Sequence, residues 1–170
     1  MSIHPRVAGT AVLAALFLAA PAAGALTPGT GDPGLAEVAQ AAPSPAQQVL
    51  ALVNAERQKA GCAPVRLDTR LTAAAQKHSA DMADHDFFSH TGSGASKFAD
   101  RIRAEGYPTP RSENIAAGNA TADATVRQWL NSAGHRRNIL DCTAKDMGLG
   151  VATNPGAKFR TYWTQDFGRG

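Results

Sequence analysis

Apolar positions recur at helical spacing through the stretch from Leu71 to His90, near the middle of the chain. The residues at positions i, i+3, i+4, i+7 and i+11, which form one face of an α-helix, are Leu71, Ala74, Ala75, His78 and Met82. The helical pattern ends at Phe87 and Phe88, and a Ser-His-Thr-Gly turn follows. This stretch therefore predicts a central helix that carries His78 toward the core and delivers His90 just beyond its end.

Other helices are predicted where an apolar face begins at a capping residue. Ser44-Pro45-Ala46-Gln47 is a capping box that begins the first helix, and Gly61 ends it. The apolar face of this helix leaves Glu56 and Arg57 on the side expected to face solvent. Later helical segments are expected over residues 97–105, 121–130 and 135–140.

The pattern changes to strand-like alternation near the end of the chain. Met147, Leu149 and Val151 alternate with small residues, and an aromatic-rich run follows an Asn-Pro-Gly turn, which predicts a β-hairpin. A short extended link is expected over residues 64–67, and a further strand near residues 113–117. Helices first and strands last predict an α+β fold in which helices pack on an antiparallel sheet.

The first 25 residues are expected to form a cleaved signal peptide. A weakly basic start precedes Val7–Ala20, an apolar run of 14 residues, and Ala23-Gly24-Ala25 is a small-residue cleavage signature. The run is shorter than the roughly 20 residues that a membrane span needs. Residues 26–43 are rich in Gly, Pro and Ala, which predicts a flexible linker, and residues 44–170 have the length of a single domain.

Charge and cysteine content restrict the function further. The formal net charge is +3, and Arg136-Arg137 is the only adjacent basic pair, so nucleic-acid binding is not expected. Cys62 and Cys142 are the two cysteines, and an even count in an oxidising compartment predicts one disulfide. That bond would close a loop of about 80 residues, worth roughly 4–5 kcal/mol in the chain-entropy model. The alternatives are two isolated buried thiols and a zinc site, which would lack the paired CxxC spacing.

The side chains able to carry chemistry are few, because the chain has no HExxH, GxSxG, P-loop or GxGxxG motif. His90, in a loop behind two aromatics, could bind a metal or act as a base, and Glu113 could orient a histidine. Each also has a structural interpretation: His90 could bond a backbone carbonyl, and Glu113 could be a surface carboxylate. His135 could satisfy carbonyls at a helix end, and His78 could simply pack in the core.

Six stretches in consistent order resemble the CAP superfamily, also called the SCP-like or pathogenesis-related protein domain, in its bacterial secreted form. They are LVNAERQKAGC, LTAAAQKHSADMADHDFFSHTG, DRIRAEGY, SENIAAGNATADATVRQWLNSAGHRRNIL, MGLGVA and YWTQDFG, and they cover nearly all of Asn54–Gly168. The resemblance implies an α-β-α sandwich with a cleft lined by family histidines and acidic residues.

The resemblance also assigns candidate site residues. His90 matches the family histidine after the helix, and Glu113 matches the acidic residue of the G-E-N motif, in which Ser112 replaces glycine here. Tyr162 stands where the second family histidine would be, and the later helix lacks the family's second glutamate. His135, from an SxGHRxNIL motif, would then complete a His90–Glu113–His135 cluster able to hold zinc or a similar divalent ion. The secondary candidates are His78, Tyr162 and Ser112.

We therefore expect an exported bacterial protein that acts as a non-catalytic binding or interaction module. One alternative is a hydrolase, metal-assisted or using the His90–Glu113 pair as general base, that acts on peptide or cell-envelope material. Another is capture of lipids or sterol-like molecules. The expected partner is an extracellular or cell-envelope ligand, the protein is expected to be a monomer with no transmembrane segment after signal cleavage, and a divalent metal is the only candidate cofactor.

Overall fold

The computed structural model describes residues 41–170, so the expected signal peptide and most of the expected linker lie outside the described residues. The elements are α1 (Pro45–Lys59), β1 (Arg66–Leu67), α2 (Thr69–Asp84), α3 (Phe98–Ala104), β2 (Pro110–Ala117), α4 (Ala122–Asn131), α5 (Ala133–Ile139), β3 (Asp146–Thr153) and β4 (Thr161–Gly168). Among these residues, no helix is long and apolar enough to cross a membrane. The predicted central helix is α2, with Asp68 as its N-cap.

The four strands form one sheet in the order β1-β3-β4-β2. β3 and β4 form the predicted antiparallel hairpin, and β2 pairs antiparallel with β4, which confirms and lengthens the strand expected near residues 113–117. The predicted extended link contributes the two-residue β1, which pairs parallel with β3. The sheet is therefore antiparallel in its three long strands and mixed only at this short edge.

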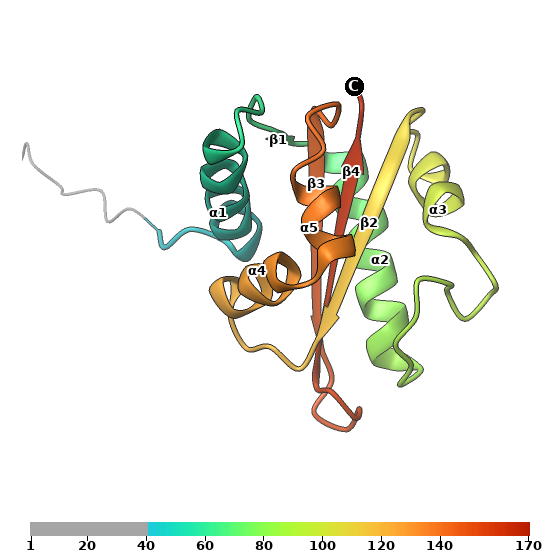
Figure 1. Cartoon of the computed structure of the whole chain (residues 1–170). Helices are drawn as coiled ribbons and strands as arrows, with labels where there is room; N and C mark the ends of the chain where they lie inside the picture. The colour runs from blue at the N-terminus through green and yellow to red at the C-terminus, as the bar shows by residue number, and fades with distance from the viewer. Residues whose placement is uncertain (1–40) are drawn as a thin grey trace, which may run out of the picture. The chain divides into compact units, whose positions relative to one another are not determined.

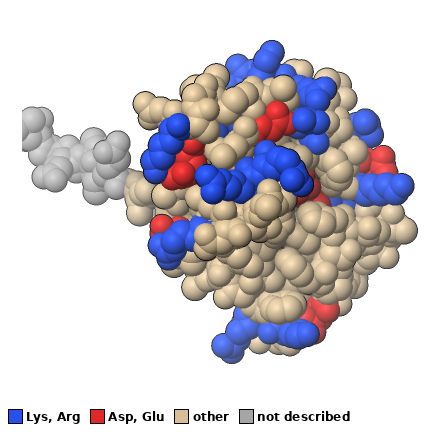
Figure 2. All heavy atoms as spheres, in the orientation of Figure 1, with Lys and Arg blue, Asp and Glu red and all other residues tan. Residues whose placement is uncertain are grey.

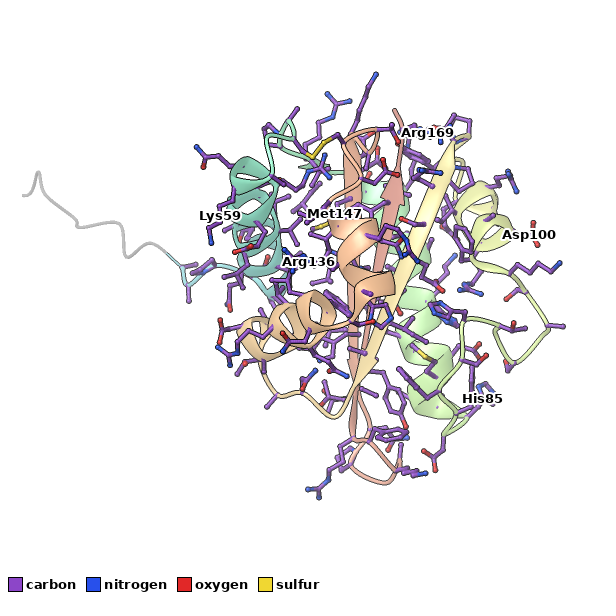
Figure 3. The ribbon with its side chains drawn as sticks, in the orientation of Figure 1. Lys59, His85, Asp100, Arg136, Met147 and Arg169 are labelled. Atoms are coloured by element: carbon purple, nitrogen blue, oxygen red, sulfur yellow. A yellow bond between two sulfur atoms is a disulfide. The ribbon has the colours of Figure 1, made fainter. Side chains whose placement is uncertain are left out.

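Helices cover both faces of the sheet, as Figure 1 shows. α2 packs along β3 and β4 on one face, whereas α1, α4 and α5 lie on the other, and α3 sits beside β2 and α2. The larger core lies on the α1–α4–α5 face, where Met147 points between the helices and the sheet (Figure 3). This arrangement confirms the α-β-α sandwich within an α+β fold.

Two glycines on β3 set how closely α2 approaches the sheet. A Cβ atom on Gly148 would lie 2.1 Å from the backbone carbon of Leu71, and one on Gly150 would lie 2.3 Å from that of Ala75. The small residues that alternate with apolar ones in this strand are therefore required by helix–sheet contact. These glycines let the α2 backbone pack directly on the sheet, which excludes water from the side chains between the helix and the sheet.

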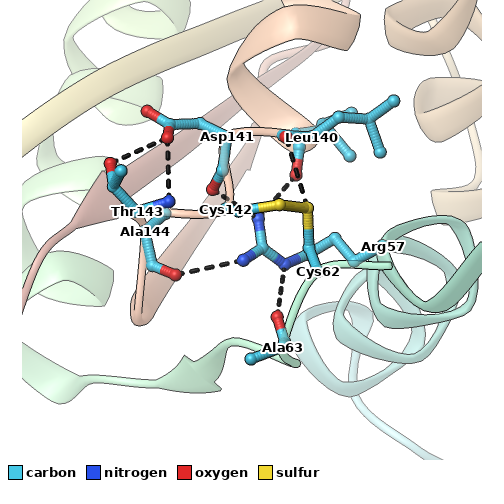
Figure 4. The surroundings of a disulfide bond; sticks show 9 residues. Arg57, Cys62, Ala63, Leu140, Asp141, Cys142, Thr143 and Ala144 are labelled. Atoms are coloured by element: carbon cyan, nitrogen blue, oxygen red, sulfur yellow. Dashed lines mark hydrogen bonds between the residues drawn. A yellow bond between two sulfur atoms is a disulfide. The ribbon is translucent and has the colours of Figure 1, made fainter. Parts of the chain in front are cut away.

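The predicted disulfide joins Cys62, after α1, to Cys142, before β3 (Figure 4). Beside it lies Arg57, which is fully buried, so the expectation that Arg57 faces solvent is wrong. Its guanidinium donates to the carbonyl oxygens of Ala63, Ile139, Asp141 and Ala144 at 2.8–3.0 Å. The carbonyl of Ile139 is at the end of α5 and the other three lie in turns near the disulfide, and the five donors of an arginine can bond all four.

Charged side chains are mixed over the surface. On the face drawn in Figure 2, Lys and Arg side chains alternate with acidic and uncharged ones, and a broad uncharged area lies below them.

Candidate functional site

The end of α2 positions the segment that carries His90. His78 on α2 has a fully buried ring, and its Nε2 lies 2.9 Å from the carbonyl oxygen of Ser89, so this nitrogen carries the proton and donates. The ring of Phe87 lies 6.3 Å from the His78 ring and packs with the smaller core cluster around Met82. The segment before His90 is therefore tied to α2 on two sides.

The loop after His90 is held to α2 by Asp81. Its carboxylate accepts hydrogen bonds from the backbone N–H of Ser93 at 2.9 Å and from the Ser93 hydroxyl at 2.6 Å. Gly92 lies so close to Asp81 and Ser96 that a Cβ atom there would meet the Ser96 hydroxyl oxygen at 2.5 Å. These contacts fix the loop that separates His90 from α3.

The centre of the candidate site is a hydrogen-bonded pair, His90 and Glu113. His90 Nδ1 lies 2.8 Å from Glu113 Oε1, although the two residues are 23 positions apart in the sequence. The Glu113 side chain is 1% exposed and the His90 side chain 54% exposed. A carboxylate accepts from Nδ1–H, so the pair fixes the tautomer of His90 and leaves its Nε2 available at the surface.

Arg101 on α3 completes this arrangement. It donates from Nη2 to Glu113 Oε2 at 2.6 Å and to the carbonyl oxygen of His90 at 3.1 Å, while Nη1 donates to the carbonyl oxygen of Ser96 at 2.8 Å. One guanidinium thus joins the strand, the helix and the loop, and it occupies the second oxygen of Glu113. The sequence analysis did not single out Arg101, because its spacing on a short helix is also that of a solvent-facing cation.

A second carboxyl, that of Asp166, lies beside Glu113. The two residues are paired across β2 and β4, and Asp166 is 1% exposed. Burial raises the pKa of Asp166 well above its usual range, and the neighbouring Glu113 charge adds to this. The sequence analysis missed Asp166 as well; the signal was an acidic residue in the strand-like run of residues 161–168, which alternation places on the same face as Tyr162 and Thr164.

His135 lies on α5 and is not hydrogen-bonded to the His90–Glu113 pair in residues 41–170. Its backbone carbonyl accepts from Asn114 Nδ2 at 3.2 Å, and its Nδ1 is buried without a partner among these residues. Burial lowers the pKa of His135, and the proximity of His90 lowers it further. The structure therefore brings His90 and Glu113 into contact and leaves His135 as a near neighbour of His90.

The three secondary candidates occupy different surroundings. His78 is buried beneath the site; its Nδ1 has no partner within the described part of the chain, and burial lowers its pKa. The hydroxyl of Tyr162 donates to Asp86 Oδ1 at 3.0 Å at the end of α2, away from Glu113. Ser112 lies beside Asn138, next to α5, and its buried Oγ has no partner in residues 41–170. Within residues 41–170, neither the Tyr162 hydroxyl nor the Ser112 hydroxyl is hydrogen-bonded to His90 or to the Glu113 carboxylate.

Two asparagines connect the site to α5. Asn138 donates from Nδ2 to Asn114 Oδ1 at 2.8 Å and to the backbone carbonyl of Glu113 at 3.2 Å, and Asn114 donates to Gln165 Oε1 at 3.0 Å. These amides lie on the sheet face opposite the Glu113 side chain. The asparagines of the Ser-Glu-Asn and Arg-Asn-Ile-Leu stretches therefore attach α5 to β2.

The donor set does not fit a divalent metal. In the described residues, no group of three or more His, Cys, Asp or Glu side chains is placed to hold a metal ion. Both oxygens of Glu113 are already engaged, one by His90 Nδ1 and the other by Arg101, whose positive charge would repel a metal cation. The expected zinc cluster of His90, Glu113 and His135 therefore lacks the geometry that zinc requires, and we derive no chemistry through a metal.

A cavity of about 330 Å³ lies beside Arg101, between α2, α3 and the loop that follows His90. Its lining includes His78, Lys77, Asp81 and Glu105, with alanine side chains between them. Lys77 and Glu105 are paired at 2.6 Å, so the charges at this wall compensate each other. The volume is at the lower end of the range for small-molecule sites, which suits a compact polar ligand.

Comparisons with known sequences agree with this architecture. The model of the cysteine-rich secretory protein family, CAP, matches residues 50–167. The uncharacterized protein YkwD of Bacillus subtilis (strain 168) is 37% identical over 123 residues, which cover 71% of this chain and 46% of the relative. The uncharacterized membrane protein YlbC of the same organism is 35% identical over 123 residues, covering 71% of this chain and 33% of YlbC. The chain thus spans less than half the length of these two relatives.

Solved structures give the same result. An extracellular protein containing an SCP domain from Bacillus anthracis str. Ames has a TM-score of 0.65 and 31% identity, with 74% of this chain and 40% of that chain covered. An outer surface protein from Borrelia burgdorferi has a TM-score of 0.63 and 17% identity, with 71% of this chain and 89% of that chain covered. At that identity the second likeness shows the fold alone.

Proposed function

Because the chain belongs to the CAP family of cysteine-rich secretory proteins, we propose that it is an exported, non-catalytic binding module whose ligand binds His90 of the His90–Glu113 pair and extends to the cavity lined by Arg101. Export is supported by the signal-peptide pattern of residues 1–25 and by the disulfide between Cys62 and Cys142. The proposed mature chain begins at Leu26. Intact mass of the protein recovered from culture medium tests this start, and a chain that retains residues 1–25 contradicts it.

The observation that carries the binding role is the full engagement of Glu113. Its two oxygens accept from His90 Nδ1 and from Arg101, so the carboxylate orients a histidine and compensates a guanidinium, which are the contacts of a positioning group. His90 Nε2 is then the ring atom that faces outward, suited to donate to or accept from a polar group of the ligand. Both thiols are in the disulfide, and Ser112 does not contact His90, so these groups supply no nucleophile to the pair.

The experiment is cosedimentation of the full exported chain with purified bacterial cell-wall sacculi, a peptide-linked glycan. We expect His90→Ala to reduce binding about five- to tenfold, since it removes one ligand hydrogen bond worth about 1–1.4 kcal/mol. Lys59→Ala is the control, because Lys59 is a 71% exposed cation on α1, on the other face of the sheet from the site. Equal retention of the wild type, His90→Ala and Lys59→Ala would contradict this binding role.

A hydrolase is the second candidate, favoured by the 2.8 Å contact between His90 Nδ1 and Glu113. A carboxylate that orients an imidazole in this way lets Nε2 accept a proton from water, as a general base does. Release of soluble fragments from the same sacculi, lost in both His90→Ala and Glu113→Gln, would establish hydrolysis in place of simple binding. Urea unfolding of each variant shows whether the fold is retained.

The lipid-capture alternative has weaker support from the cavity walls. Lys77, Asp81, Arg101 and Glu105 all contribute to the lining, and burying an apolar chain against them would desolvate charged groups. Phe88, 44% exposed, is one of the most exposed large apolar residues, and its ring lies 5.8 Å from that of Phe159. Saturable lipid binding that is unchanged in His90→Ala and lost in Phe88→Ser would support this alternative.

A further inference from the structure

Two carboxyl groups are sealed together under α2. Glu113 on β2 and Asp166 on β4 are directly opposite each other, and opposite residues of antiparallel strands point to the same face with Cβ atoms about 5 Å apart. Gly148 lies opposite Asp166 on β3, and the backbone of Leu71 on α2 rests against this glycine. The close approach of α2 excludes water from Asp166, which is 1% exposed.

The groups that face this pair provide one positive charge for two acids. Arg101 on α3 lies near both carboxyls, and its guanidinium bonds Glu113. His78 on α2 donates from Nε2 to a carbonyl and has its pKa lowered by burial, so at neutral pH it is uncharged. β3 presents only Gly148 at this position. Two adjacent carboxylates with a single buried guanidinium would leave one negative charge uncompensated, which is strongly unfavourable away from water.

The hydrogen bonds identify which of the two acids is neutral. Glu113 accepts from His90 and from Arg101, both of which stabilise its anionic form. Asp166 receives no such donor in residues 41–170; its Oδ1 is buried without a partner, and its position opposite Glu113 in the sheet places the two carboxyl groups side by side on one face. A carboxyl in these surroundings becomes favourable once it is protonated, because it then acts as a donor to its neighbour.

We infer that Asp166 carries a proton at neutral pH and donates a hydrogen bond to Glu113, so that Asp166 is a positioning residue of the His90–Glu113 pair. The Glu113 carboxylate then has three donors, from Asp166, Arg101 and His90, and its orientation is fixed on every side. The consequence for ligand binding rests on the proposed function, whereas the proton on Asp166 does not.

The direct test is carboxyl ¹³C NMR of the full exported chain, titrated from acid to neutral pH. The carboxyl carbon of Asp166 should keep the chemical shift of a protonated acid at neutral pH, well above the pKa of about 3.9 of an aspartate in an unfolded peptide. A change of the Asp166 resonance to that of an ionised carboxylate between about pH 3 and about pH 5 would overturn the inference. This measurement needs no ligand, so its result is independent of whether the proposed function is correct.

Two substitutions test the positioning role. Asp166→Asn keeps a neutral donor of the same shape, and we expect it to retain the downfield Nδ1–H resonance of His90 and wild-type retention on sacculi. Asp166→Val keeps the site dry but removes the donor, and we expect a weakened or lost His90 resonance and several-fold lower retention. If Asp166→Val retains the resonance, Asp166 does not position the pair, whatever the binding result. If the resonance changes as expected while retention stays at the wild-type level, the positioning role holds and the proposed function fails.

Discussion

Arg101 and Glu113 form an ion pair with a 2.6 Å contact in which the two side chains are 11% and 1% exposed. The pair attaches α3 to β2 and places the guanidinium that bonds Glu113 within the wall of the α2–α3 cavity. A buried pair of this kind contributes little net stability by itself, yet each partner is costly to lose because the other stays charged in a dry environment. Glu113 therefore depends on Arg101 for a buried charge partner and for its orientation toward His90.

Removing the cation should destabilise the protein strongly. We expect Arg101→Met to lower the free energy of unfolding by about 3–5 kcal/mol, because it leaves Glu113 buried without its cation. Urea unfolding followed by the fluorescence of Trp129 and Trp163, both buried, measures the change. The double variant Arg101→Met/Glu113→Gln should regain a large part of the loss. A single variant within about 0.5 kcal/mol of wild type, the range of ordinary surface substitutions, would contradict the prediction.

Arg57 should be equally sensitive for a different reason. Arg57→Met removes a donor from four carbonyl oxygens around the disulfide. The carbonyl of Asp141 keeps the backbone N–H of Ala144, and each of the others that is left buried without a partner costs about 1–3 kcal/mol. We therefore expect the free energy of unfolding, measured with guanidinium chloride, to fall by at least about 3 kcal/mol. Lys59→Met is the matched control on the same helix, since Lys59 points outward with a 71% exposed side chain (Figure 3). Similar losses in both variants would refute the role of the Arg57 hydrogen bonds.

These two arginines show where sequence reasoning succeeds and where it stops. Helical periodicity located α2 and placed His78 on its buried face, because burial of apolar groups leaves a local pattern. The partners of Arg57 include carbonyls 82 to 87 positions away, and no local pattern encodes them. Arg57 therefore looked like an ordinary solvent-facing cation.

The candidate site could also be predicted from the sequence only in part. His90 and Glu113 were identified from motifs and lie in contact, separated by 23 positions in the sequence. Asp166 was missed because its neighbour is set by the register of β2 on β4, which depends on the whole sheet. The zinc hypothesis was reasonable from residue types alone, but Arg101 occupies the oxygen of Glu113 that a metal would need.

The disulfide should contribute through the unfolded state. Cys62 and Cys142 are 80 positions apart, so replacing both with serine should cost about 4–5 kcal/mol in the chain-entropy model, less any residual structure in the unfolded chain. Differential scanning calorimetry of the wild type and the double serine variant measures the loss. Thiol titration of the native exported protein should find no free thiol. Two titratable thiols, or an unchanged melting temperature, would contradict the bond's proposed contribution.

The contact between α2 and β3 predicts a sharp difference between two glycines. Gly150→Ala would bring a methyl group to 2.3 Å from the backbone of Ala75, and neither backbone can move without separating helix from sheet. We expect the free energy of unfolding to fall by about 2–4 kcal/mol. This lies at the upper end of the usual cost of overpacking a core, or above it, because the methyl group would meet backbone atoms. Gly94→Ala is the control, because a Cβ there meets nothing within 4 Å. Thermal unfolding followed by circular dichroism compares the two variants. Equal melting temperatures would contradict the prediction, because they would show that α2 can move away from β3 without a loss of stability.

Burial of His78 predicts a pH-dependent stability whose sign is opposite to that produced by Asp166. Burial lowers the pKa of His78, so the folded protein binds a proton on this ring only at a lower pH than the unfolded chain does. The unfolded chain takes up that proton near its ordinary value of about 6.5, and stability is therefore full above this pH and falls as the pH drops toward the folded-state pKa. Asp166, with a raised pKa, makes stability fall as the pH rises above about 3.9.

His78→Gln isolates the histidine contribution, because glutamine does not titrate and can still donate to the carbonyl of Ser89. We expect the free energy of unfolding of the wild type, relative to that of the variant, to decline between about pH 7 and about pH 5, with a limiting slope of about 1.4 kcal/mol per pH unit. Urea unfolding at matched ionic strength measures both proteins across this range. The double variant His78→Gln/His135→Gln should lose still more of the decline, because burial lowers the pKa of His135 as well. Parallel stability profiles for the wild type and His78→Gln would mean that His78 is protonated in the folded protein as readily as in the unfolded chain.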